Sequence, residues 1–285
     1  MTTIHSRYVS VNGIRTHYLE AGAGPTVVLL HSGEFGGAAE ISWEFNVSEL
    51  AKHFHVIAPD WLGFGRTDKV VDFADPRGRV FQHMIAFIDM MRYALNAVGA
   101  WHFIGNSMGA SNLLKLAADR PRRIQVKSII AASGGGFAPL TPAREALLAY
   151  DGSTESMRAV VGAMFHSNSW KEDEAYIAKR QQMALLPGAW QAAASARLRL
   201  PGAEGPAAFG KEDTTAYELI DVPTLLIAGA QDQLRLPGYA DELSGRIAGS
   251  RVRVFKQCGH CANIECADEF NALVIDFIKG VEVES

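Results

Sequence analysis

The sequence lacks several features that would place it in a specialised class of protein. Its three cysteines all lie between positions 258 and 266, which is unlike the disulfide framework of a small secreted domain. No apolar run approaches the roughly 18 residues needed to cross a bilayer, and the first residues lack the apolar core of a signal peptide. The net charge of −4 gives no reason to expect nucleic acid or an anionic membrane as a partner. These absences predict a cytoplasmic protein with neither kind of partner.

Apolar runs typical of buried strands alternate with helix-like segments along most of the 285 residues. Continuous apolar strands separated by helices predict an α/β fold, with a mostly parallel sheet covered by helices on both faces. Asn12-Gly13, between two alternating runs, predicts a hairpin, so the sheet is expected to begin antiparallel. The predicted strands are 26–30, 55–58, 101–104, 126–132, 224–228 and 252–255, and the predicted helices include 43–54, 81–98, 237–247 and 267–279.

The alternation stops between about 137 and 220, where the chain is rich in Ala, Met, Arg and Gln and has no clear buried strand. This region predicts several helices, interrupted at Pro187-Gly188 and Pro201-Gly202. We therefore expect a core domain made of residues 1–136 and 221–285, with residues 137–220 inserted as a helical cap, or lid, over the site.

The segment Gly105-Asn106-Ser107-Met108-Gly109 has the form G-x-S-x-G and lies between a predicted strand and a helix-like segment. In this context the serine lies on a tight strand-to-helix turn that holds its hydroxyl out above the sheet. Glycines are needed two residues to either side because neighbouring chain passes too close for side chains. The pattern predicts Ser107 as a catalytic nucleophile.

A serine hydroxyl is a poor nucleophile at neutral pH, so it needs a base and a carboxylate that orients the base. In folds built around this turn, the acid and then the histidine follow the serine, each after a later strand. Asp232 follows the predicted strand 224–228, and His260 follows 252–255. The sequence therefore predicts a triad of Ser107, His260 and Asp232.

Other titratable residues compete for these roles. Asp60 also follows a predicted strand, but it precedes the serine in the chain, whereas the expected acid follows it. His102, inside a predicted strand, is expected to be structural. Cys258 and Cys261 flank His260 with a spacing also found in redox pairs and zinc sites. A redox pair should open a helix after an early strand, and zinc would need a fourth ligand, so we expect no metal and no cofactor.

A tetrahedral intermediate at Ser107 also needs two N–H donors for its oxyanion. One is expected from Met108, the residue after the nucleophile, and the other from the glycine-containing loop 31–37. Gly33 is the best candidate in that loop, and His31 is expected to brace it.

With these motifs the chain resembles the α/β-hydrolase superfamily over essentially its whole length. More narrowly, it is similar to the meta-cleavage product hydrolases, which break C–C bonds in vinylogous diketo acids from aromatic-ring degradation. The matching stretches are 105–109, 258–260 with 267–271, and the loop 31–37. The resemblance implies a small-molecule substrate and assembly into homo-oligomers of unspecified order.

The resemblance also implies substrate contacts. Arg180 falls near an arginine that the family uses for the substrate carboxylate, and a planar guanidinium suits a carboxylate. The alternative for Arg180 is a solvent-facing helix residue. Ser32, Asn106, Phe45 and Cys261 complete the predicted substrate-binding set.

The chain departs from the family pattern around the expected pocket. Ser32 and Glu34 replace expected glycines, and Phe35 stands where a proline is usual. Phe45 lies near a position that is often a polar carboxylate contact, and Cys261 occupies a position that is usually tryptophan. These departures alter the wall of the pocket and leave the predicted triad intact.

The resemblance implies hydrolysis of a C–C bond in 2-hydroxy-6-oxo-dienoate acids. The main alternative is a carboxylesterase or lactonase, because both would use the same triad. Haloalkane dehalogenases and epoxide hydrolases resemble this fold but need a carboxylate nucleophile, which disfavours them here. A cofactor-free haloperoxidase or perhydrolase is a minor alternative, and a ligand receptor with a slow triad belongs to a different class altogether.

Overall fold

A computed structural model describes residues 2–72, 74–195 and 209–283. Its centre is an eight-stranded sheet with the order β1-β2-β4-β3-β5-β6-β7-β8. Every neighbouring pair from β4 onward in this order is parallel, and β1 and β2 are antiparallel, as predicted. The strands are β1 (His5–Val11), β2 (Ile14–Ala21), β3 (Thr26–Leu30), β4 (His55–Pro59), β5 (Trp101–Asn106), β6 (Val126–Ala132), β7 (Thr224–Gly229) and β8 (Arg251–Phe255).

The predicted hairpin joins β1 and β2. Asn12 and Gly13 both have positive φ, 51° and 83°, as a two-residue type I′ turn requires. The turn sets the register that pairs Val11 with Ile14 and places Tyr18 opposite Pro59 of β4.

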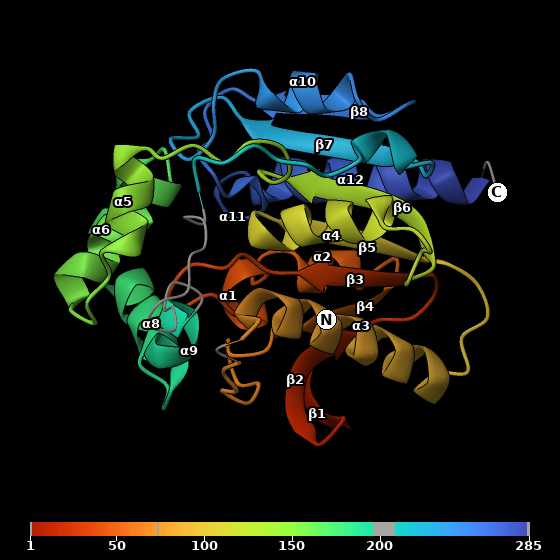
Figure 1. The fold of residues 1–285 in the computed structure, drawn as a ribbon, viewed down its shortest axis with the longest axis horizontal. Coiled ribbons are helices and arrows are strands. Elements are labelled where there is room, and N and C mark those ends of the chain that lie inside the picture. Colours follow the sequence, from red (N-terminus) through yellow and green to blue (C-terminus); the bar gives the residue numbers. More distant parts are fainter. Residues whose placement is uncertain (1, 73, 196–208, 284–285) are drawn as a thin grey trace.

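The core strands are apolar on both faces because helices cover both. In β3, Val28 and Leu30 belong to one buried cluster, whereas Val27 and Leu29 belong to another. Helices α3 (Pro76–Ala94), α4 (Met108–Ala118) and α10 (Tyr239–Ser244) pack on the first face. Helices α2 (Val47–Leu50) and α12 (Ala267–Val283) pack on the second. Figure 1 shows these layers, with α3 and α4 in front of the sheet.

The helices of the core are generally short, with α3, α4 and α12 as the longer ones. They are α1 (Ala39–Ser42), α2 (Val47–Leu50), α3 (Pro76–Ala94), α4 (Met108–Ala118), the 3₁₀ turn η1 (Tyr217–Leu219), α10 (Tyr239–Ser244), α11 (Ala262–Glu265) and α12 (Ala267–Val283).

Two predicted helix ranges were wrong in their bounds. The range 43–54 is helical only over Val47–Leu50. Asn46, just before this helix, does not cap it with its side chain, which donates to the Asn263 carbonyl and to the Asn271 side chain. The range 81–98 is replaced by Pro76–Ala94, because Asp75 caps the helix with Pro76 at its first position.

Helices of the region 137–220 form a separate group at one end of the sheet (Figure 1). They surround an apolar cluster of their own, which includes Tyr150, Met157 and Ile177. The turn at Pro187-Gly188 separates two of them, as predicted, whereas Pro201-Gly202 lies outside the described residues. The helices are α5 (Pro142–Leu148), α6 (Thr154–Met164), α7 (Asn168–Glu172), α8 (Glu174–Ala184) and α9 (Ala189–Ser195).

Within the described ranges, none of the helices combines the length and the apolar character needed to cross a membrane.

Candidate active site

Ser107 lies on the turn between β5 and α4 in a strained backbone conformation. Its φ and ψ are 54° and −111°, outside the regions that L-residues ordinarily occupy. Such a conformation costs about 1–3 kcal/mol, so the surroundings must enforce it. The Ser107 N–H donates to the Ala132 carbonyl at 2.8 Å, and the Ser107 carbonyl accepts from the Ser111 N–H at 2.9 Å. The turn therefore fixes the serine at the carboxyl edge of the sheet.

The two glycines of the motif are required by space. A Cβ on Gly105 would lie 2.5 Å from the backbone nitrogen of Ala110, inside contact distance. A Cβ on Gly109 would overlap the carbonyl of Leu30 in the neighbouring strand. Larger residues at either position would push α4 away from the sheet and with it the serine.

The structure brings Ser107, His260 and Asp232 together. The Ser107 hydroxyl lies 2.7 Å from His260 Nε2, and His260 Nδ1 lies 2.7 Å from Asp232 Oδ2. His260 and Asp232 are buried, and Ser107 is half-buried. With the ring proton on Nδ1 toward Asp232, Nε2 is free to accept the serine proton.

Asp232 is held as a carboxylate. Burial acts to raise its pKa, but the charge and hydrogen bond of His260 and the donated Leu234 N–H at 2.8 Å outweigh it. The net result is a pKa below the ordinary value, which suits an acid that orients a histidine and is not itself protonated.

The loop that carries His260 is tied to the helical group 142–195. The His260 N–H donates to the Met164 carbonyl at the end of α6 at 2.7 Å. Glu265 accepts the Gly259 N–H at 2.6 Å and the Ser167 N–H at 2.6 Å through its two oxygens. The sequence analysis did not single out Glu265. Its one signal there is that it lies close to His260 in the chain, which does not by itself indicate a role.

Gly33 lies directly against Met108. A Cβ on Gly33 would be 2.5 Å from Met108 Sδ, so a larger residue there would require the Met108 side chain or the loop after β3 to shift. His31 braces that loop at its start. Its Nδ1 donates to the Ser32 carbonyl at 2.6 Å, and its Nε2 accepts the Trp61 N–H at 3.0 Å. Burial lowers the pKa of His31, which keeps it in the neutral form that this bonding requires.

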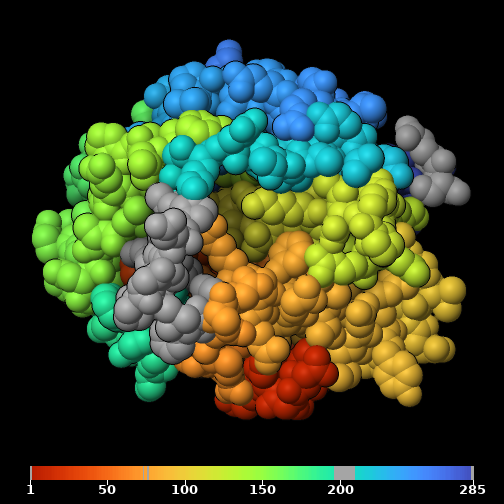
Figure 2. Space-filling view, in the orientation of Figure 1, coloured from red at the N-terminus to blue at the C-terminus, as the bar shows by residue number. Residues whose placement is uncertain are grey.

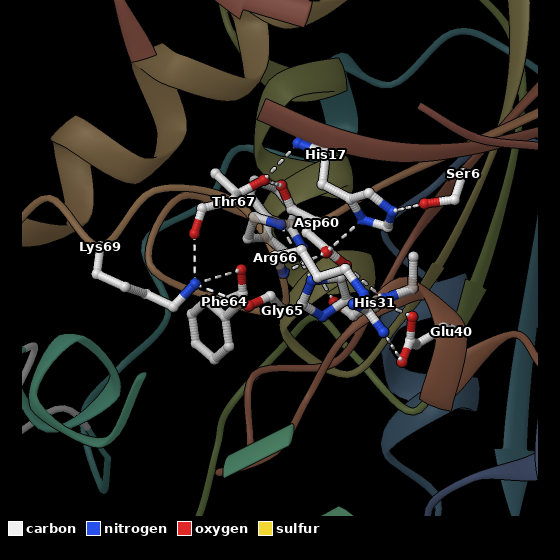
Figure 3. Close-up of polar contacts among 12 residues, drawn as sticks. Ser6, His17, His31, Glu40, Asp60, Phe64, Gly65, Arg66, Thr67 and Lys69 are labelled. Atoms are coloured by element: carbon white, nitrogen blue, oxygen red, sulfur yellow. Dashed lines mark hydrogen bonds and ion pairs between the residues drawn. The ribbon is translucent and has the colours of Figure 1, made fainter. Parts of the chain in front are cut away.

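Asp60 serves a different cluster (Figure 3). Its carboxylate accepts the His17 Nδ1 proton at 2.7 Å, the Ala39 N–H at 2.7 Å and the Arg66 N–H at 2.8 Å. Burial acts to raise its pKa, but these hydrogen bonds and the nearby His31 hold it below the ordinary value. Asp60 is therefore a buried anchor for the loops around β2 and β4, and in the described structure it makes no hydrogen bond to His260.

Arg180 lies in α8 and is fully buried, so the solvent-facing alternative is wrong. Its guanidinium forms an ion pair with Glu34 of the loop after β3 and donates to the Tyr176 hydroxyl at 2.9 Å. Glu34 is itself buried. The positive charge of Arg180 is therefore compensated within the chain by one of the residues that departs from the family pattern.

Of the other predicted substrate contacts, two lie beside the nucleophile, and Ser32 and Phe45 contact other parts of the chain. Asn106 and Cys261 meet beside the nucleophile, with Asn106 Nδ2 3.6 Å from Cys261 Sγ. The Ser32 hydroxyl lies 3.2 Å from that of Ser42. Phe45 is 42% exposed and packs edge-on against Trp170, so its ring faces the helical group.

The thiols near His260 are poorly suited to metal binding or redox exchange. Burial raises the pKa of both Cys258 and Cys261, which favours the thiol over the thiolate that either chemistry uses. Both ring nitrogens of His260 are also engaged by Ser107 and Asp232. Among the residues that the structure describes, no group of three metal-ligating side chains comes together.

Figure 2 shows a hollow on one face of the molecule, between orange chain that follows β4 and cyan chain that precedes β7. Yellow to olive chain, the colour of the β5–α4 region in Figure 1, forms its floor.

Comparison with known proteins agrees with this architecture. The model of the Alpha/beta hydrolase family matches residues 27–273. A 2-hydroxymuconate semialdehyde hydrolase of Pseudomonas sp. (strain CF600) is 29% identical over 97% of this chain and 94% of its own. A 2-hydroxy-6-oxo-6-(2′-aminophenyl)hexa-2,4-dienoic acid hydrolase of Metapseudomonas resinovorans is 29% identical over 96% of this chain and 90% of its own.

Solved structures show the same likeness. A serine hydrolase involved in carbazole degradation has a TM-score of 0.80 at 28% identity and covers 97% of this chain and 99% of its own. A variant of a meta-cleavage product hydrolase has a TM-score of 0.83 at 25% identity, covering 96% and 98%. These relatives confirm the predicted resemblance to meta-cleavage product hydrolases. Because the family model spans most of the sequence, the chain belongs to the α/β-hydrolase family.

Proposed function

We propose that this chain is a hydrolase in which Ser107 is the nucleophile, His260 the general base and Asp232 the residue that orients His260. The observation that carries the proposal is the continuous pair of 2.7 Å contacts from the Ser107 hydroxyl through His260 to Asp232. The strained turn at Ser107 supports it, because it presents the hydroxyl at the start of a helix.

The N–H groups of Gly33 and Met108 are the donors for the oxyanion in this proposal. Their support is that Gly33 lies against the side chain of Met108, which directly follows Ser107 in the chain. The start of α4 adds the positive end of the helix dipole at the same place.

Residues 137–220 are proposed as a cap over the core domain of residues 1–136 and 221–285. Helices α5 to α9 carry this role, whereas η1 near the end of that range packs in the core. The hydrogen bond from His260 to Met164 and the ion pair of Arg180 with Glu34 support this role. Both contacts join the helical group to loops that carry site residues.

The substrate class is a 2-hydroxy-6-oxo-dienoate acid, and the reaction is hydrolysis of the C–C bond beside its 6-oxo group. Relatives named as hydrolases of such compounds match this chain over nearly its whole length, which supports the proposal. After the dienol ketonises, Ser107 attacks the carbonyl carbon, and His260 takes the proton of the serine hydroxyl. The C–C bond then breaks, its electron pair leaves with the dienoate fragment, which is protonated, and the other fragment stays as an acyl ester on Ser107. A water molecule, deprotonated by His260, hydrolyses this ester to a carboxylic acid and returns the proton to Ser107.

One observation favours a second candidate, a carboxylesterase or lactonase. Arg180, the expected anchor for a substrate carboxylate, already carries the carboxylate of Glu34. A site that used no other cation would have little affinity for an acid and would suit a neutral ester or lactone.

We expect the enzyme to act in the cytoplasm, since its thiols are free. Assembly into a homo-oligomer is proposed on the resemblance alone.

The test is the loss of dienolate absorbance when the purified protein is mixed with 2-hydroxy-6-oxo-6-phenylhexa-2,4-dienoate. Rapid loss that Ser107→Ala abolishes would establish C–C hydrolysis. Absence of loss, with fast Ser107-dependent cleavage of p-nitrophenyl butyrate, would assign the chain to ester or lactone chemistry.

A further inference from the structure

Arg235 is a buried cation that forms no direct ion pair with any of the described residues. It lies three positions after Asp232 and is only 7% exposed. Its guanidinium carbon lies 4.3 Å over the ring of Tyr239, and its Nε and Nη2 atoms are buried with no hydrogen-bond partner. An unpaired buried charge is costly, so native proteins normally supply such a group with an anion.

Arg144 places a second cation in the same region. Its guanidinium donates to the carbonyls of Pro139 at 2.8 Å and Leu234 at 2.6 Å, and it forms no ion pair within the described ranges. Burial, followed by the charge of Arg235, lowers the pKa of Arg144 to about 10, with Asp232 acting against them. Asp232 supplies one negative charge against the two arginines, so positive charge is in excess here.

This excess contrasts with Arg180. Both arginines are buried, but Arg180 has Glu34 as an ion-pair partner, whereas Arg235 has none in the described part of the chain. Of the two, Arg235 is the one whose guanidinium retains unused donors on both Nε and Nη2.

The loop after β6 approaches both Arg235 and the turn at Ser107. A Cβ on Gly136 would be 3.7 Å from Arg235 Nη2, and a Cβ on Gly134, two residues earlier, would be 2.5 Å from the Ser107 carbonyl. The short loop after β6 thus connects the surroundings of Ser107 to Arg235. The charge of Arg235 further contributes to lowering the pKa of Asp232.

We propose that Arg235 binds a carboxylate of the substrate, through its unpartnered Nε and Nη2 donors, and so takes the role expected of Arg180. This assignment rests on the proposed function for the presence of an acid in the substrate. Nε and an Nη atom form one edge of the planar guanidinium, which matches the two oxygens of a carboxylate.

The experiment compares benzoate with its neutral counterpart benzamide as competitive inhibitors of p-nitrophenyl butyrate hydrolysis. We expect benzoate to bind the wild type more tightly than benzamide. Arg235→Gln should raise the inhibition constant of benzoate by about tenfold to a hundredfold, because hydrogen bonds to a charged group are lost. The inhibition constant of benzamide should stay nearly unchanged. With the dienoate substrate, the same variant should raise KM by a similar factor and change kcat much less.

Three variants serve as controls. Arg235→Lys keeps the positive charge but lacks the paired N–H donors of a guanidinium. Its preference for benzoate should therefore lie between those of the wild type and Arg235→Gln. The double variant Glu34→Gln with Arg180→Gln removes the internal ion pair without leaving a lone charge, and it should keep the preference for benzoate. Arg246→Gln removes an exposed arginine that pairs with Glu218 and should match the wild type throughout.

Thermal unfolding provides a readout that needs no turnover. Benzoate should raise the unfolding midpoint of the wild type but not that of Arg235→Gln, because a ligand stabilises only the fold that binds it. The proposal is overturned if the wild type does not distinguish benzoate from benzamide. It is equally overturned if Arg235→Gln keeps that preference while the Glu34/Arg180 double variant loses it. Failure to cleave the dienoate would instead refute only the C–C assignment, since ester kinetics and unfolding still report on Arg235.

Discussion

The described residues include two Ser–His–Asp arrangements with almost the same hydrogen bonds. In one, Ser107 Oγ lies 2.7 Å from His260 Nε2, and His260 Nδ1 lies 2.7 Å from Asp232. In the other, the Ser6 hydroxyl lies 2.9 Å from His17 Nε2, and His17 Nδ1 lies 2.7 Å from Asp60 (Figure 3). By these distances alone, either serine qualifies as a nucleophile.

The backbones around the two serines differ. Ser6 lies in β1 at the edge of the sheet, exposed and paired with Leu19 in regular antiparallel register. Ser107 lies on a strained turn at the start of α4, with Gly33 pressed against the next residue. In addition, Asp60 accepts two backbone N–H groups besides His17, which makes it a structural anchor.

The comparison teaches that a hydrogen-bonded triad is not in itself a catalytic site. Catalysis also needs donors aimed at the position where negative charge develops, and these come from the backbone around the serine. In the proposed site Met108 and Gly33 supply them at Ser107, whereas the extended strand at Ser6 begins no helix.

The largest expected effect separates the two serines directly. Ser107→Ala should reduce kcat at least about a thousandfold, and as much as about a millionfold, by analogy with triad deletions. Ser6→Ala is the matched control and should keep wild-type kcat and KM. Steady-state kinetics, with whichever of the dienoate and the ester is cleaved faster, measures both variants. A large loss of kcat in Ser6→Ala would contradict the assignment of Ser107 as the nucleophile.

The two aspartates should fail in different ways. Asp232→Asn should lower kcat by roughly a hundredfold to ten-thousandfold with little change in fold, because the histidine loses its orienting acceptor. Asp60→Asn should cost about 2–4 kcal/mol of stability, because an amide cannot accept every N–H that now meets the carboxylate. Urea unfolding and kinetics on both variants check this. Equal stability of the two would argue against Asp60 as an anchor.

Gly33→Ala tests the part of the site that has no counterpart at Ser6. The added methyl group would lie 2.5 Å from Met108 Sδ, so the loop or Met108 must shift. We expect kcat to fall about tenfold to a hundredfold, with a smaller change in KM. This decrease is smaller than the largest ones caused by removing an oxyanion donor altogether, because the Gly33 N–H is shifted and not lost. Gly280→Ala, where an added Cβ meets nothing within 4 Å, is the control and should leave kinetics unchanged.

The smallest effect is the dependence of stability on pH. Burial, followed by the charge of Arg79, lowers the pKa of His83 to about 4, and burial also lowers those of His31 and His102. As pH falls below about 6.5, these histidines take up protons in the unfolded chain while they are still neutral in the fold. The free energy of unfolding should therefore decrease between about pH 6.5 and pH 4. Urea unfolding across this range measures the slope, which His83→Gln should reduce. A flat profile in the wild type would contradict the assignment of these histidines as neutral in the fold.

A second decrease should follow at lower pH. The pKa values of Asp60 and Asp232 are both held below their ordinary value in the fold. Their contribution is present above about pH 3.8 and is lost as pH falls through the folded values. Asp60→Asn should remove part of this second decrease.

Much of the architecture could be predicted from local sequence. Continuous apolar runs gave the strands, Asn12-Gly13 gave the hairpin, and the chain order of Ser107, Asp232 and His260 indicated that they meet at one edge of the sheet. These features depend on periodicity and on the geometry of parallel strands, which a sequence carries directly.

Features that depend on tertiary contact could not be predicted. The pairing of Glu34 with Arg180 joins positions 146 residues apart, and the Ser6–His17–Asp60 arrangement depends on how β2 lies beside β4. Arg235 has no signal in the sequence, because its importance lies in the partner that it lacks. The helix bound at Asn46 was missed for a similar reason, since its side chain bonds a distant segment. The bound at Asp75 comes instead from a local cap, which apolar spacing alone does not reveal.

The most direct test of the central claim is to label the folded wild-type protein with diisopropyl fluorophosphate and to locate the adduct by tandem mass spectrometry. The account predicts a stoichiometric adduct on Ser107, with no adduct on Ser6 and loss of activity in parallel with labelling. An adduct on Ser6, or complete inactivation with Ser107 unmodified, would contradict it.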